Sequence, residues 1–102
     1  MSTDRAGTGV APRFDADAAW CLHPQVSIRP ERFGALLYHF GTRRLSFLKN
    51  PTLLTVVRSL EAQPSARTAC SAAGIEDAEL PAYINALSAL AASTMICERT
   101  GE

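Results

Sequence analysis

The chain divides near its middle into a part where apolar and polar residues alternate and a part where apolar residues recur at helical spacing. Between residues 20 and 28 every second position is apolar or proline, which is typical of a strand with one buried face, although Pro24 is expected to interrupt it. We expect a break at residues 29–31. Residues 33–40 and 43–48 then predict a second and a third strand.

The turn between the last two strands is predicted at Gly41-Thr42. A two-residue turn with glycine first suits a type II′ hairpin, which needs a positive φ at that position. In the strand that follows, alternation places Leu45 and Phe47 on one face. The opposite face is expected to carry Arg44, Ser46 and Leu48.

Beyond the strands the pattern predicts three helices. Asn50 is a good N-cap and Pro51 suits the first helical position, so a helix is expected from there to about residue 60. Ser65 is expected to cap a second helix that ends at Gly74. The third helix is marked by an apolar stripe at Leu80, Ile84, Leu87, Ala91 and Met95. The order indicates an α+β, winged-helix-like fold, in which a three-stranded antiparallel sheet precedes three helices.

Composition and charge limit the possible functions. The 102 residues suffice for one domain, which we expect over residues 14–97, between a flexible N-terminal tail at residues 1–13 and a C-terminal tail at residues 98–102. Ten Lys+Arg balance ten Asp+Glu, but residues 21–49 carry a net +4 and residues 76–102 a net −4. Positive charge is therefore concentrated toward the N-terminal half of the chain and negative charge toward its C-terminal end.

Candidate catalytic and metal sites are weak. Cys21 and His23 would share a strand face, but two ligands do not make a metal site. His39, Trp20 and Cys70 are each expected to be buried structural residues. The three cysteines show no zinc spacing, and no segment resembles a signal peptide or a membrane span. We therefore expect a cytoplasmic, non-catalytic protein with no cofactor and no metal.

A winged helix suggests DNA binding as the alternative function. The third helix does not favour it, because residues 77–95 contain no Lys or Arg. Asn85 alone is inadequate for reading bases.

The strand at residues 43–48 is the main candidate binding element. It contains no proline and has cations near both ends, so an extended peptide could pair with its backbone by β-augmentation. An acidic peptide would be favoured by Arg43, Arg44 and Lys49, although these residues could equally serve only to protect an exposed edge. Replacing Ser46 with proline is expected to abolish peptide binding while leaving the fold largely intact.

A family resemblance supports this interpretation. Residues 29–49 read RPERFGALLYHFGTRRLSFLK, and together with residues 51–60 and 80–83 they closely resemble the MftB family of mycofactocin peptide chaperones, which has the PqqD-like fold of RiPP recognition elements. The resemblance implies binding to the leader of the precursor peptide MftA and contact with the radical SAM maturase MftC, which would hold the SAM and iron–sulfur clusters. It implies that the leader lies beside the third strand and against the third helix. The implied peptide-binding residues are Arg43, Arg44, Leu45, Ser46, Phe47 and Leu48, with Ile84, Leu87 and Ala91 as candidate groove residues inferred from helical spacing.

Overall fold

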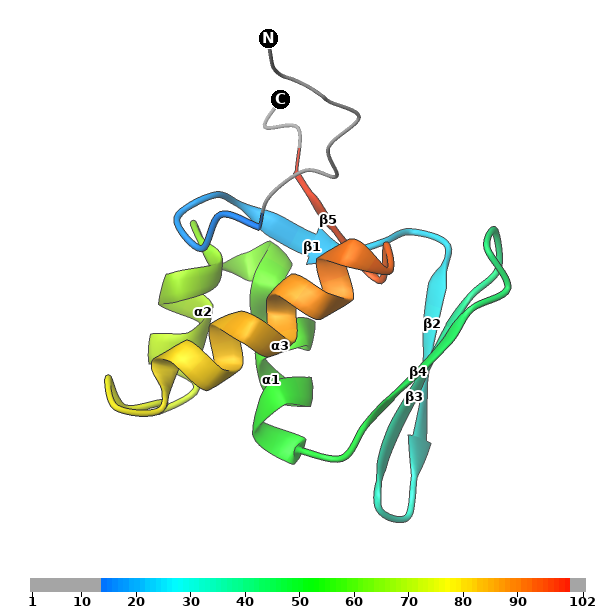
Figure 1. The fold of residues 1–102 in the computed structure, drawn as a ribbon, viewed down its shortest axis with the longest axis horizontal. Coiled ribbons are helices and arrows are strands. Elements are labelled where there is room, and N and C mark those ends of the chain that lie inside the picture. Colours follow the sequence, from blue (N-terminus) through cyan, green and yellow to red (C-terminus); the bar gives the residue numbers. More distant parts are fainter. Residues whose placement is uncertain (1–13, 100–102) are drawn as a thin grey trace, which may run out of the picture.

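The computed structural model describes residues 14–99, so the expected tail at residues 1–13 and the last three residues lie outside the described part. Strands β2 (Val26–Glu31), β3 (Gly34–His39) and β4 (Leu45–Leu48) form an antiparallel sheet in that order. Strands β1 (Trp20–Leu22) and β5 (Ile96–Glu98) form a separate antiparallel pair (Figure 1).

Three α-helices follow the sheet. They are α1 (Pro51–Ser59), α2 (Ala66–Ala72) and α3 (Leu80–Ala92), and the short 3₁₀ helix η1 (Leu60–Ala62) extends α1. The expected α+β order of three strands followed by three helices is confirmed. Figure 1 shows the helices grouped on one side of the β2–β3–β4 sheet, with the β1–β5 pair lying across their top.

The boundaries of α1 and α2 lie where local sequence signals predict them, whereas α3 ends at Ala92, before the expected stripe residue Met95. The Asn50 side chain accepts hydrogen bonds from the backbone N–H groups of Thr52 and Leu53, at 2.8 and 3.3 Å, which satisfies two donors of the first turn of α1. Ser65 and Thr68 form a reciprocal capping box at the start of α2. Gly74 follows α2 with a φ of 88°, as a left-handed C-terminal cap requires.

The strands differ from the prediction in three places. Pro24 interrupts the first predicted strand as expected, and its two halves become β1 and β2 in different sheets. The expected break at residues 29–31 is wrong, because these residues belong to β2 and the turn lies at residues 32–33. Strand β5 was not predicted, because three residues near the chain end carry too little periodicity to identify a strand.

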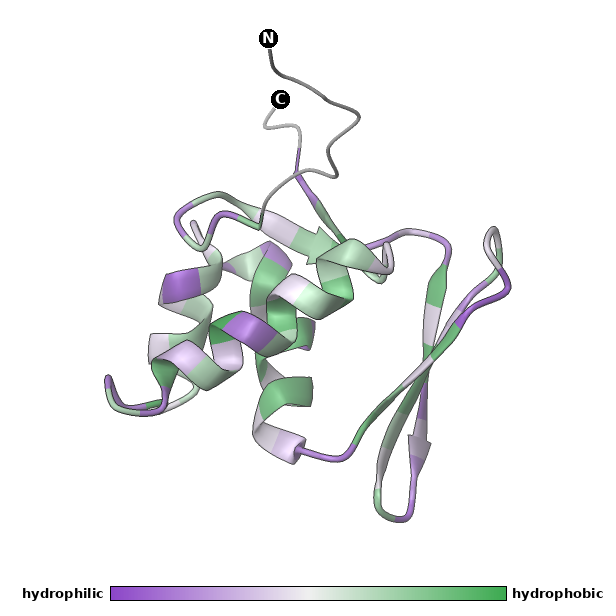
Figure 2. Cartoon of the chain, viewed as in Figure 1, coloured by the Kyte–Doolittle hydropathy of each residue, from purple (hydrophilic) through white to green (hydrophobic). Residues whose placement is uncertain are grey.

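The core lies between the inner face of the sheet and the helices. Each strand of this sheet contributes one residue to the core cluster: Val26 from β2, Leu37 from β3 and Leu48 from β4. They pack in one cluster with the buried residues of the helices. Helix α1 packs against β3 and β4. In Figure 2 the hydrophobic residues concentrate on the helices and recur along the strands, while the loop between β3 and β4 includes hydrophilic residues.

Candidate peptide-binding edge

Strand β4 forms one edge of its sheet. In the part of the chain that the structure describes, it pairs with β3 on one side and with no strand on the other. Leu45 lies opposite Tyr38, and Phe47 lies opposite Leu36. As expected from the sequence, no strand of residues 14–99 occupies the outer side of the backbone rim from Leu45 to Leu48.

The loop before β4 determines which backbone groups face this open edge. The His39 N–H donates to the Arg44 carbonyl at 3.0 Å, so residues 39 and 44 form a hydrogen-bonded pair. Hydrogen-bonded and non-hydrogen-bonded pairs alternate along an antiparallel ladder. Ser46 and Leu48 therefore direct their N–H and C=O groups toward β3, whereas Leu45 and Phe47 direct theirs outward.

This geometry corrects the expected effect of proline at Ser46. The N–H of Ser46 belongs to the ladder with β3, so its removal would weaken the sheet itself rather than a contact with a peptide. The donors available to an added strand are those of Leu45 and Phe47.

The opposite edge of the sheet, at β2, has a different hydrogen-bonding phase. The Phe40 N–H donates to the Gln25 carbonyl at 2.8 Å, so residues 25 and 40 form a hydrogen-bonded pair. Alternation then turns the odd-numbered residues of β2 toward β3. Its outward-facing positions are Val26, Ile28 and Pro30.

The β2 edge is poorly suited to accept another strand. The Val26 N–H already donates to the His23 carbonyl at 2.9 Å. Pro30 has no N–H, and a proline at such a position is a common protection of sheet edges. Ile28 is the one residue of β2 that keeps an outward donor, whereas β4 has two, so β4 is the better candidate edge for pairing with a peptide.

The two faces of β4 have different surroundings. Leu48 is buried against the core and Ser46 is half-buried on the same inner face. Leu45 and Phe47 lie on the outer face, away from the helices, and remain 60% and 45% exposed. The expected separation of these residues onto two faces is confirmed.

The β3–β4 loop is built differently from the predicted turn. Arg43, rather than Gly41, adopts positive φ, at 64°. A Cβ at Gly41 would come close to the end of the exposed Gln25 side chain, which can move, and to the ring of the buried His39. The buried His39 ring accepts hydrogen bonds at Nδ1 from the N–H groups of Gly41 and Thr42, at 3.0 and 3.1 Å. His39 is thus a structural residue, as expected, and its loop presents the exposed Arg43 and Arg44 beside the open edge.

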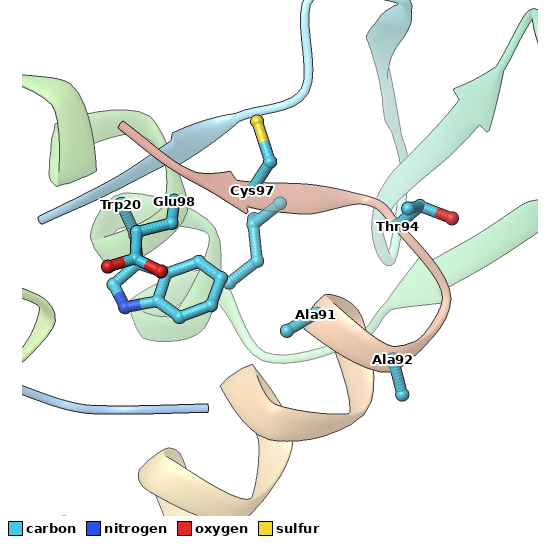
Figure 3. Close-up of a pocket in the computed structure, with 7 residues that line it drawn as sticks. Trp20, Ala91, Ala92, Thr94, Cys97 and Glu98 are labelled. Carbon is cyan, nitrogen blue, oxygen red and sulfur yellow. The ribbon is translucent and has the colours of Figure 1, made fainter. Parts of the chain in front are cut away.

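The three candidate groove residues on α3 are not brought together beside β4. Leu87 is fully buried in the core and has no surface open to a ligand. Ile84 lines a hollow with Phe14 and Arg67. Ala91 lines another hollow, of about 250 Å³, with Trp20 and residues of β5 (Figure 3). This face of α3 is turned toward the N-terminal segment and the β1–β5 pair, so the structure does not bring the three residues expected from spacing together along β4.

Tyr83 is the α3 residue that the structure places near the end of β4. Its hydroxyl accepts a hydrogen bond from the Asn50 side-chain amide at 2.9 Å. Asn50 lies two residues after β4, so this bond ties the exit of the edge strand to the third helix. Ala86 shares the same helix face, three residues further on. The sequence signal that could have singled out Tyr83 is a polar tip on an otherwise apolar stripe.

The described residues offer little catalytic chemistry. No group of three or more His, Cys, Asp or Glu could hold a metal ion in residues 14–99. The Cys97 thiol lies 3.9 Å from Cys21, and burial together with this contact raises its pKa to about 11, so it stays protonated at neutral pH. Cys70 is fully buried, as expected. Across the same residues, no helix has the length and apolarity needed to span a bilayer.

Comparison with known proteins gives consistent relatives. The chain is 60% identical over 91 residues to a protein named peptide chaperone MftB from Mycobacterium ulcerans (strain Agy99), covering 89% of this chain and 81% of that protein. A protein of the same name from Mycobacterium tuberculosis (strain ATCC 25618 / H37Rv) is 58% identical over 86 residues, covering 84% and 79%. A third, from Mycolicibacterium smegmatis (strain ATCC 700084 / mc(2)155), is 57% identical over 83 residues, covering 81% of each chain. No solved structure matches the chain.

The family model decides the assignment. The model of the peptide chaperone MftB family matches residues 19–97, which include every strand and helix from β1 almost to the end of β5. The chain belongs to the MftB family of peptide chaperones. Members of this family are non-catalytic, so the MftB-family protein described here is not an enzyme.

Proposed function

We propose that this MftB-family protein binds the leader of the precursor peptide MftA as an added strand along β4 and delivers it to the radical SAM maturase MftC. The observation that carries the proposal is the contrast between the two sheet edges. On β4, Leu45 and Phe47 turn their backbone N–H and C=O groups outward, whereas the β2 edge has a bonded donor at Val26 and no donor at Pro30.

The helical side of the peptide site is proposed at Tyr83 and Ala86. Both are half-buried, and Tyr83 is bonded to the residue that caps α1 directly after β4. They replace Ile84 and Ala91, whose helix face is turned toward the β1–β5 pair. Side chains on the inner face of the added strand would lie between Ser46 and this part of α3.

The proposed mechanism is positional. A leader held on the chaperone, while the chaperone docks on MftC, raises the effective concentration of the core peptide at the maturase active site. No covalent bond is made or broken on the chaperone. The three cysteines are unpaired, which supports action in the reducing cytoplasm.

The test is a pair of substitutions at one residue. Phe47→Pro removes an outward N–H and introduces a ring at the pairing edge, while Phe47→Ala removes the side chain and keeps the N–H. One lost hydrogen bond costs about 0.5–1.5 kcal/mol, and each 1.4 kcal/mol is roughly tenfold in affinity. With steric exclusion of the partner strand added, we expect Phe47→Pro to bind the MftA leader at least ~10-fold more weakly than Phe47→Ala in calorimetric titration.

Both variants should keep the fold, because this N–H makes no bond to β3. Equal affinity of the two variants for the leader would contradict strand addition at β4. The alternative of a DNA-binding winged helix is not supported by the placement of the basic residues, since α3 carries none and Arg43 and Arg44 lie in the β3–β4 loop.

A further inference from the structure

The outer face of the sheet becomes more apolar from one edge to the other. On β2 this face carries Ser27, Arg29 and Glu31, all of them exposed. On β4 it carries Leu45 and Phe47, which we call the outer pair. A sheet edge that only met water would be expected to show the reverse order, with polar or charged side chains at the open strand.

The outer pair is covered on one side only. Leu45 is paired with Tyr38 of β3, and Phe47 is paired with Leu36, so each has an apolar neighbour within the sheet. Phe40 extends this surface into the loop, because its ring meets Tyr38 edge-on with centroids 5.2 Å apart. On the side of the open edge, the described residues place no strand beside the outer pair.

A strand added to β4 would complete this row. Directly opposite side chains in neighbouring strands lie about 4.5–5.5 Å apart at Cβ, so alternate residues of an added peptide would pack against Leu45 and Phe47. Cations stand near one end of the outer pair, because Arg43 and Arg44 are exposed in the loop just before it.

We infer that the outer pair contacts side chains of the bound peptide, in addition to the contacts proposed for Tyr83 and Ala86 on the inner side. The inference rests on the proposed function, and it specifies the ligand: an extended segment with apolar side chains at two positions two residues apart on its outer face. An acidic residue at the end next to Arg43 and Arg44 completes the pattern. The apolar surface at the edge is thus part of the peptide-binding site, and the bound peptide shields it from water.

The test compares Leu45→Thr/Phe47→Thr with a matched control. Threonine keeps the backbone N–H groups and a good strand propensity while removing most of the apolar surface. The control is Phe33→Thr, which removes a 76% exposed aromatic side chain at the β2–β3 turn, away from the edge. We expect the double variant to bind the MftA leader roughly 10-fold or more weakly in calorimetric titration, and the control to bind like the original protein.

A scan of single replacements along the leader peptide identifies which peptide positions contact the outer pair. Leader peptides with single threonine replacements should lose affinity for the original protein at alternate positions on both faces of the added strand. In the double variant the losses on the outer face should disappear, while those on the inner face remain. The single variant Leu45→Thr repeats the test if the double variant has an altered circular dichroism spectrum.

Three outcomes would overturn the inference. Unchanged leader affinity of the double variant, with weak binding by Phe47→Pro, would mean that pairing through the backbone holds but the outer pair is not read. Unchanged leader affinity with lost stimulation of MftC would assign the outer pair to the maturase. A change from dimer to monomer in sedimentation, at unchanged leader affinity, would assign it to a second copy of this chain. If Phe47→Pro also bound normally, the proposed strand addition itself would fail.

Discussion

Thr94 adopts a left-handed backbone conformation that suits glycine far better. Its φ is 61°, and it lies just after α3. The N–H of Met95 donates to the Leu90 carbonyl at 2.8 Å, and that of Thr94 donates to the Ala91 carbonyl at 3.1 Å. These two bonds form a Schellman motif, whose left-handed position is usually glycine. A β-branched residue there is strained.

We therefore expect Thr94→Gly to stabilise the fold. A non-glycine residue in this conformation destabilises the folded state by roughly 1–2 kcal/mol. Glycine relieves this strain, but the greater entropy of glycine in the unfolded state reduces the gain by about 0.5–1 kcal/mol. The expected net gain is about 0.5–1 kcal/mol in the free energy of unfolding, measured by urea denaturation.

The matched control for this prediction is Gly74, which ends α2 with the same pair of hydrogen bonds and a φ of 88°. A Cβ at Gly74 would meet nothing within contact distance, so Gly74→Ala should destabilise through the backbone alone. Lower stability of Thr94→Gly than of the original protein would contradict the strain at Thr94.

Residues with local signals were predictable, and residues that depend on distant contacts were not. Asn50, Ser65 and Gly74 act on backbone groups within a few positions of themselves, so the sequence alone identifies their roles. His39 was expected to be structural, but its bonds to the loop N–H groups depend on the path of the loop. The positive φ of Arg43 has no residue-type signal.

At the scale of elements, the β3–β4 loop determines which backbone N–H groups of β4 face the open edge. A two-residue turn at residues 41–42 would close on a hydrogen-bonded pair of residues 40 and 43. The observed loop closes on His39 and Arg44 instead. The strand register is the same in both cases, but the hydrogen-bonding phase shifts by one residue. This shift moves the N–H of Ser46 from the open edge to the ladder with β3, and it explains why the sequence predicted an outward donor at Ser46 that the structure does not have.

The same loop presents the cations of the site. Arg43→Glu with Arg44→Glu should weaken leader binding by roughly 10-fold at low salt, since exposed charge pairs contribute up to about 1 kcal/mol each. The affinity of the original protein should fall as salt rises, because the pairs are exposed and screened. Calorimetric titration over a series of salt concentrations measures both effects.

The matched control for the loop is Arg29→Glu with Arg32→Glu, which makes the same change in net charge at the far edge of the sheet. These arginines lie in β2 and in the β2–β3 turn. An equal loss of leader affinity in both variants would show that only the net charge of the protein matters. Leader binding that does not change with salt would contradict a role of Arg43 and Arg44 in binding.

On the scale of the whole molecule, the charge polarity of the sequence becomes a spatial polarity. The basic β3–β4 loop and the acidic segment before α3, residues 76–79, lie at opposite sides of the molecule (Figure 1). The longest dimension is 47 Å, several times the Debye length of about 8 Å at physiological salt. The acidic segment lies across the molecule from the cations beside the open edge, and salt weakens an interaction over such a separation.

The arrangement of the two sheets could not be predicted from the pattern. Strand β5 has three residues and pairs with β1, which lies 76 positions earlier, at Cys21 and Cys97. The same return of the chain places Ile84 and Ala91 near the N-terminal segment and β5, an arrangement that helical spacing alone could not predict. Long-range pairing of short strands leaves almost no trace in local periodicity.

Amide hydrogen exchange measured by NMR, with and without a saturating amount of the MftA leader peptide, tests the central claim most directly. The account predicts that the N–H groups of Leu45 and Phe47 exchange quickly in the chaperone alone and become protected in the complex. The Ile28 N–H, at the opposite edge, should be unaffected. Unprotected Leu45 and Phe47 in a saturated complex, or protection at Ile28 instead, would contradict strand addition at β4.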